Sequence, residues 1–131
     1  MKDRFSELSV LWFIRAKDDY LWAKDSFEDK HFGGVCFLSQ QVAEKALKAY
    51  LFFVKQKLVR THNLERLLEN CLKFDKEFIK LRKNCQILTD YYIDTRYPDI
   101  WDHEQFDNRK IAQKALDLAQ DVIEFLKNKL D

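Results

Sequence analysis

The sequence predicts an all-α protein, folded as an antiparallel up-and-down bundle of four to five helices. Glycine and proline are scarce, with two Gly and one Pro among 131 residues, whereas a sheet-rich fold needs many turn residues. Apolar residues recur every three or four positions along most of the chain, which is the spacing of amphipathic helices. The length predicts one domain, spanning residues 1–131, that is large enough to bury its own core.

The first two helices are expected over about residues 6–29 and 35–57, with Gly33-Gly34 marking the break between them. The second segment is apolar around most of its circumference and has only a narrow polar strip. A helix with two apolar faces packs against neighbours on two sides. We therefore expect this helix at the centre of the bundle.

Three more helices follow. The Thr61-His62-Asn63 turn offers capping side chains for a third helix over about residues 63–74. A fourth is expected over about residues 76–95, and a fifth from Asp107 or Asn108 to about residue 128. Short connections between such helices favour an antiparallel arrangement.

The helical pattern stops near Pro98, the chain's one proline. Proline biases the residue before it away from helical geometry, so the fourth helix should end by about Thr95 or Arg96. The loop that follows is polar and rich in aromatic residues. Loops of this kind after a helix often carry catalytic or binding residues.

Charge and cysteine content narrow the function classes. A net charge of +1 predicts no strong overall attraction to nucleic acid or to an anionic membrane. No apolar run is long enough to span a membrane, and the charged N-terminus shows no signal peptide. The cysteines fit neither a disulfide framework nor a zinc site, so we expect buried thiols in a reducing cytoplasm at Cys36, Cys71 and Cys85.

A basic strip runs from the second predicted helix into the following loop, comprising Lys45, Lys48, Lys55, Lys57 and Arg60. Most such runs are solvated faces. Glu44 is spaced to pair with Lys48 along the helix surface, which contributes a few tenths of a kcal/mol. If the strip lies beside Arg96 in a dimer, its positive charge attracts RNA or an acidic partner.

Several short motifs occur in a characteristic order. Residues 37–49, FLSQQVAEKALKA, contain a Gln pair followed by Ala-Glu-Lys and Leu-Lys, and residues 92–99 read YIDTRYPD. Ala16-x-x-Asp19 and Thr61-His62-Asn63-Leu64 are supporting matches. Together these motifs resemble the HEPN family, a family of helical bundles found in higher eukaryotes and prokaryotes. The resemblance covers nearly the whole chain and implies a bundle of the same kind.

The resemblance also implies a function. HEPN proteins are frequently homodimers, and many prokaryotic members form a toxin–antitoxin pair with a small nucleotidyltransferase. Many are metal-independent ribonucleases with an Arg-x(4–6)-His motif, which Arg96 and His103 match with six residues between them. Two positions depart from the family's patterns. Tyr97-Pro98 follows the arginine where active members usually have a small polar or charged residue. Gln105 stands where toxins modified by their partner have a tyrosine.

RNA cleavage without a metal needs a base for the 2′-hydroxyl proton, an acid for the leaving oxygen and positive charge beside the phosphorane. We expect His103 to serve as the base and Arg96 to hold the phosphate, with two such pairs facing across a dimer cleft. Tyr97 and Trp101 are candidates to stack a splayed base. Lys48 is a candidate contact to RNA or to a nucleotide.

Other interpretations stay open. Arg96 could neutralise the carbonyls at the helix end or pair with Asp99, with His103 simply exposed. A hard cation could bind oxygen ligands in this loop at Asp99, Asp102, His103, Glu104 and Asp107. However, no spacing matches a calcium loop and no Gly-rich phosphate loop is present, so neither a metal nor a cofactor is predicted.

The alternative function is a non-catalytic helical module. Such a module would dock beside the active site of a small nucleotidyltransferase and help to hold its nucleotide or substrate. The Tyr97-Pro98 dipeptide favours this alternative, whereas Arg96 and His103 favour the enzyme.

Overall fold

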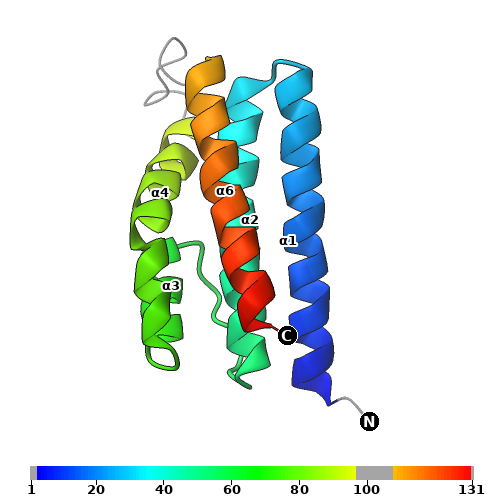
Figure 1. Ribbon diagram of the computed structural model, residues 1–131, viewed down its shortest axis with the longest axis vertical. Coiled ribbons are helices and arrows are strands. Elements are labelled where there is room, and N and C mark those ends of the chain that lie inside the picture. The colour runs from blue at the N-terminus through cyan, green and yellow to red at the C-terminus, as the bar shows by residue number, and fades with distance from the viewer. Residues whose placement is uncertain (1–2, 97–107, 131) are drawn as a thin grey trace.

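The protein is a bundle of long antiparallel helices, and the predicted fold class is confirmed (Figure 1). The computed structural model describes residues 3–96 and 108–130, and no strand occurs among them. In chain order the described elements are α1 (Arg4–Glu28), α2 (Phe32–Phe53), α3 (Leu64–Leu72), the 3-10 helix η1 (Lys76–Leu81), α4 (Arg82–Arg96) and α6 (Arg109–Lys129).

The prediction that α2 lies at the centre is confirmed. It packs against α1, α3, α4 and α6, and α1 and α4 run antiparallel to it on different sides (Figure 1). Its apolar side chains fill the main core together with leucines of α3 and α4 and the aliphatic face of α6. All three cysteines are buried in the core, as the sequence predicts.

The ends of α1 and α2 differ from the prediction. Gly33-Gly34 is not the break, because α2 already begins at Phe32. The chain turns instead at Lys30, which has a left-handed φ of 64°. The backbone N–H of Lys30 donates to the Phe27 carbonyl (3.0 Å) and that of His31 to the Ser26 carbonyl (2.8 Å). This pattern of bonds is a Schellman cap with lysine in the position that glycine usually takes.

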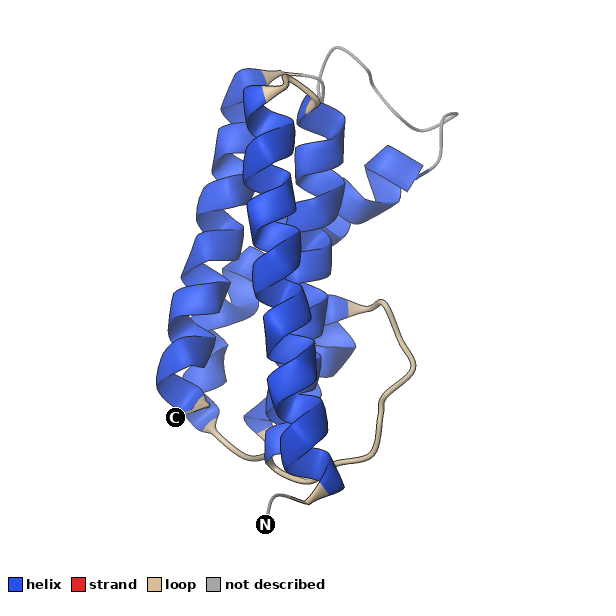
Figure 2. Cartoon of the chain, turned by 90° about the vertical axis from the view of Figure 1, so that its right-hand side faces the viewer, coloured by secondary structure: helices blue, strands red, loops and turns tan. Residues whose placement is uncertain are grey.

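The same cap ends α2 several residues before the predicted end at Lys57. Lys55 also has a φ of 64°, and the N–H of Gln56 donates to the Leu51 carbonyl (2.8 Å). The segment 54–63 then runs back alongside the bundle to the start of α3 (Figure 2). Asn63 caps α3 by accepting from the Arg66 N–H (3.1 Å), which confirms the predicted helix start.

The fourth predicted helix is two elements. Residues 76–81 form the 3-10 helix η1, capped by the Asp75 carboxylate, which accepts from the Glu77 N–H (2.9 Å). The α-helix α4 begins only at Arg82 and ends at Arg96. No helix among the described residues is long and apolar enough to cross a membrane.

Candidate functional site

The sequence places the predicted catalytic pair at and after the end of α4. Arg96 is the last residue of this helix that the structure describes, and the effect of Pro98 on the helix end stays a prediction. His103, Tyr97 and Trp101 lie outside the described residues.

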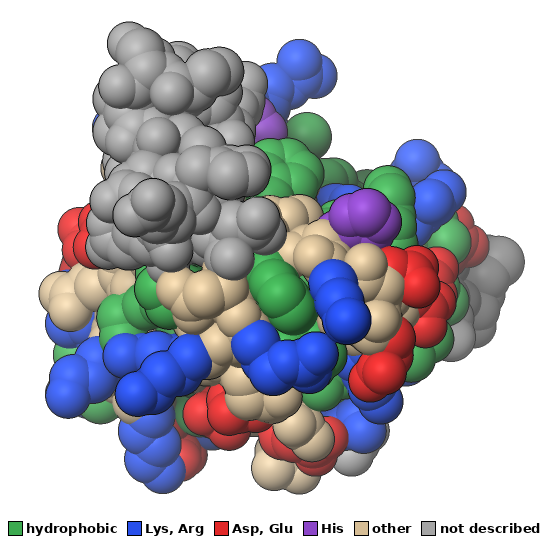
Figure 3. All heavy atoms as spheres, turned by 90° about the horizontal axis from the view of Figure 1, so that it is seen from above, with side chains coloured by type: hydrophobic (Ala, Val, Ile, Leu, Met, Phe, Trp, Pro, Cys, Tyr) green, Lys and Arg blue, Asp and Glu red, His purple; other side chains and the backbone are tan. Residues whose placement is uncertain are grey.

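The last part of α4 lies beside the beginning of α2 (Figure 1). Tyr91 is buried on α4, and burial raises the pKa of its hydroxyl, with the nearby Cys36 thiol of α2 adding to the shift. A core contact therefore fixes the helix shortly before Arg96. Viewed from this end of the bundle, Lys and Arg side chains gather on the surface (Figure 3).

A second candidate region is the polar row along α2. Gln40, Glu44 and Lys48 are spaced by four residues, so they share one face of the helix, and all three are buried. Buried charges are costly unless they are paired and hydrogen-bonded, so the partners of this row decide what it can do.

Glu44 is the centre of the row. One carboxylate oxygen accepts from the Lys48 ammonium (3.0 Å), and the other lies 3.0 Å from Nδ1 of His62. The Lys48 ammonium also lies 5.3 Å from the centroid of the Trp12 ring on α1, a cation–π arrangement. The predicted Glu44–Lys48 pair is therefore present. It is not a surface pair, because the two side chains are only 4% and 7% exposed.

Gln40 holds the returning loop. Its side-chain amide donates to the His62 carbonyl (3.2 Å) and accepts from the side-chain amide of Gln41 (2.7 Å). Together with the Glu44–His62 contact, this bond fastens the segment before α3 to the middle of α2. His62 was expected to belong to the capping turn; its imidazole is 64% exposed, but its Nδ1 also reaches the buried Glu44 carboxylate.

The remaining charged motif residues join α1 to α2. The Lys45 ammonium pairs with the carboxylate of the buried Asp19, the aspartate of the Ala16-x-x-Asp19 motif. Ser9 of α1 donates to the Ala49 carbonyl of α2 (2.8 Å). The polar residues of α2 thus connect it to α1 and to the loop, and their first role is to hold the bundle together.

These contacts divide the predicted basic strip. Lys48 is buried and Lys45 half-buried, while Lys55, Lys57 and Arg60 are exposed. The exposed members follow the end of α2 that lies away from the end of α4 (Figure 1). A contact from Lys48 to RNA or a nucleotide stays a prediction, and it requires the ammonium to exchange Glu44 for a phosphate.

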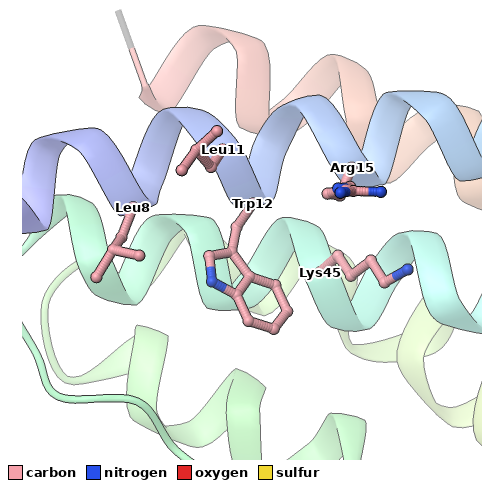
Figure 4. Close-up of a pocket in the computed structure, with 5 residues that line it drawn as sticks. All are labelled: Leu8, Leu11, Trp12, Arg15 and Lys45. Carbon is pink, nitrogen blue, oxygen red and sulfur yellow. The ribbon is translucent and has the colours of Figure 1, made fainter.

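A hollow of about 400 Å³ opens beside this network, on the face that α1 and α2 share (Figure 4). It is lined by Leu8, Leu11, Trp12, Arg15 and Lys45. Its wall is mainly apolar, with two cations at one side.

For metals, the described ranges contain no group of three or more His, Cys, Asp or Glu side chains that could hold an ion. The acidic loop considered as a cation site lies outside these ranges, and the described chain resumes at Asn108, the cap of α6.

The contacts of Trp12 and His62 with the α2 row were not predicted from the sequence. The four-residue spacing of Gln40, Glu44 and Lys48 was a usable signal for one face. Which side chains cover that face depends on the path of segment 54–63, and periodicity does not describe such a path.

The described elements define an all-helical bundle with a central helix that carries a buried polar row. A family model described as the HEPN domain matches residues 9–129. The chain therefore belongs to the HEPN family.

Solved structures agree with this assignment. The crystal structure of TT1696 from Thermus thermophilus is similar with a TM-score of 0.80 and 29% sequence identity, over 92% of this chain and 97% of that one. The crystal structure of ST0689, an archaeal HEPN homologue, is similar with a TM-score of 0.76 and 24% identity over the full length of both chains. No curated protein matches the chain.

Proposed function

We propose that this HEPN protein is a metal-independent endoribonuclease of a two-component, toxin–antitoxin-like module. It acts on RNA as a homodimer, and its partner is a small nucleotidyltransferase. The observation that carries the proposal is the position of Arg96 at the end of the described part of α4, with His103 after six intervening residues, in a chain of this family.

Each residue has a defined task in this proposal. The Arg96 guanidinium grips two phosphate oxygens and stabilises the charge that develops on the phosphorane. His103 removes the proton from the 2′-hydroxyl, whose oxygen attacks the adjacent phosphorus and displaces the 5′-oxygen of the next nucleotide. The leaving 5′-oxygen takes a proton from water, so the products are a 2′,3′-cyclic phosphate and a 5′-hydroxyl. Tyr97 and Trp101 stack a splayed base of the RNA.

Two features of the described residues support these assigned roles. The buried row of α2 uses its own charges internally, since Glu44 binds Lys48 and His62, so it serves the fold. Tyr91 is buried in the core, which anchors α4 five residues before Arg96.

The test is cleavage of a mixed RNA by purified protein in excess EDTA. We expect the wild type to cleave, and His103→Ala and Arg96→Ala to lose cleavage with unchanged helix content by circular dichroism. His31→Ala is the matched control, because His31 is exposed and makes no side-chain capping bond at the start of α2. It should cleave like the wild type.

Cleavage that persists in His103→Ala would refute the assignment of His103 as the catalytic base. If none of the proteins cleaves RNA at high concentration, the result favours the alternative function, a non-catalytic module that docks on the nucleotidyltransferase. A purified small nucleotidyltransferase would then be tested for binding to the protein.

A further inference from the structure

The hollow on the face that α1 and α2 share has an apolar part and a charged part. Its volume of about 400 Å³ lies within the range of about 300–1,000 Å³ that is usual for small-molecule sites. Four of its lining residues share one face of α1, because they are spaced by three or four positions, and one comes from α2: Leu8, Leu11, Trp12, Arg15 and Lys45. Leu8 lies on one side of the Trp12 ring and the two cations lie on the other (Figure 4). The hollow therefore changes from apolar to cationic along α1.

The Trp12 ring is held in place by side chains of α2. Its centroid lies 6.2 Å from that of the Phe52 ring, with 35° between the two planes. The Lys48 ammonium lies 5.3 Å from the same centroid. A side chain that packing already fixes loses little conformational entropy when a ligand binds. Trp12 thus offers a preformed aromatic wall, against which another ring can pack.

The charges at the other side of the hollow leave one positive charge without a partner. Arg15 is exposed, and it has no ion-pair partner within the described ranges. Lys45 is 25% exposed and pairs with Asp19. Two cations and one anion give this group a net charge of +1, and the nearby Glu44–Lys48 pair is neutral as a whole. The group therefore complements a ligand with a single negative charge.

We propose that the hollow binds a small aromatic carboxylic acid. The ring of the ligand packs against Trp12 and Leu11. Its carboxylate accepts two parallel hydrogen bonds from the Arg15 guanidinium, whose planar fork matches a carboxylate, and Lys45 lies at the side of this pair. Leu8 and Arg15 are seven residues apart, which is about 10 Å along a helix. A ligand that fills this length carries a short chain between its ring and its carboxylate.

Charge distinguishes this ligand class from a nucleotide. A phosphate monoester carries about 1.5 to 2 negative charges at neutral pH, which exceeds the free positive charge of the site. The surplus would lie near the Asp19 carboxylate, and like charges repel. The proposal uses only residues of α1 and α2 and does not rest on the proposed ribonuclease.

The first test is isothermal titration calorimetry of the full chain with 4-phenylbutyrate, which has a ring, a short chain and one carboxylate. We expect saturable binding of one molecule per chain. The neutral amide, 4-phenylbutanamide, has the same shape without the charge and should bind about tenfold more weakly. Adenosine 5′-monophosphate should also bind more weakly than 4-phenylbutyrate, because its phosphate carries the surplus charge.

Two variants with matched controls locate the site. Arg15→Gln removes the guanidinium and should raise the dissociation constant of 4-phenylbutyrate by about tenfold. Lys114→Gln removes the same charge from an exposed position on α6 and should bind like the wild type. Leu11→Asn removes a wall of the hollow and should raise the dissociation constant by about fivefold. Ile14→Asn is its control, since Ile14 is exposed on the same helix and is not one of the residues that line the hollow.

Each outcome decides the proposal. Saturable binding that weakens in Arg15→Gln and in Leu11→Asn, but in neither control, supports it. No saturable binding at millimolar 4-phenylbutyrate would overturn it. An unchanged affinity in Arg15→Gln, or an equal loss in a variant and its control, would do the same, as would tighter binding of the amide or of the nucleotide. All four substituted positions are exposed, and circular dichroism checks that each variant folds.

Discussion

The buried Glu44–Lys48 pair gives the sharpest prediction about stability. Replacing Glu44 by Gln keeps the shape of the side chain but leaves the Lys48 ammonium without its anion in a site that is 7% exposed. Breaking a buried pair by removing one partner costs about 3–5 kcal/mol. The Trp12 ring stays in place and offsets part of this cost, about 2 kcal/mol for a desolvated cation–π contact.

The net expectation for Glu44→Gln is therefore a loss of about 1–3 kcal/mol in the free energy of unfolding. This is a large part of the stability of a domain, which is about 5–15 kcal/mol in total. Lys48→Met removes the other charge, and the double variant leaves no unpaired ion in the pair. The wild type, the two single variants and the double variant form a double-mutant cycle. The coupling free energy between Glu44 and Lys48 that it measures should be about 2–3 kcal/mol.

The assay is urea denaturation followed by circular dichroism at 222 nm on the wild type, both single variants and the double variant. Glu69 and Arg82 supply a surface cycle for comparison, because their charged atoms are 2.8 Å apart, against 3.0 Å in the buried pair, but the side chains are 57% and 37% exposed. Their coupling should be about 0–1 kcal/mol. Equal coupling in the two cycles would refute the argument that burial, and not proximity alone, makes the Glu44–Lys48 pair important.

Three further predictions concern the core and one surface cluster. Ser39→Ala should raise the free energy of unfolding by about 1 kcal/mol in denaturation experiments, because its buried hydroxyl has no hydrogen-bond partner within the described ranges; a clear loss would contradict this. Burial raises the pKa of every cysteine thiol, to about 12 for the first and third, so iodoacetamide at pH 8 should label none of them in the folded protein and all of them in urea, as read by mass spectrometry: Cys36, Cys71 and Cys85. The Lys129 ammonium, 2.7 Å away, lowers the pKa of Asp75 below 3.8. The stability that this carboxylate contributes is thus present above pH 3.8 and is lost as the pH falls through the lower folded value. In Asp75→Asn the free energy of unfolding should therefore fall less steeply than in the wild type as the pH is lowered. An unchanged pH dependence would show that the Asp75–Lys129 pair does not contribute to stability.

The fold class follows from the sequence because helix periodicity is a local property. Apolar spacing alone identified the central position of α2, and the scarcity of glycine and proline argued against sheets. The ends of α1 and α2 could not be read in this way. Lys30 and Lys55 take the left-handed conformation that usually belongs to glycine, while Gly33-Gly34 lies inside α2.

The candidate site was predicted only in part. The four-residue spacing of Glu44 and Lys48 predicted their pairing, and the structure has it at 3.0 Å. Their burial depends on Trp12 from α1 and on His62 from the loop. These residues are far from Glu44 and Lys48 in the sequence, and the cover they provide arises only from tertiary packing. The roles of Arg96 and His103 stay a proposal that chemistry must test.

The most direct measurement compares two substrates of identical sequence in excess EDTA, one RNA and one with every 2′-hydroxyl methylated. The account predicts that the protein cleaves the RNA and leaves the methylated strand intact, because the attacking group is the 2′-oxygen that His103 deprotonates. Cleavage of both strands would contradict this mechanism, and cleavage of neither would contradict the assignment as a ribonuclease.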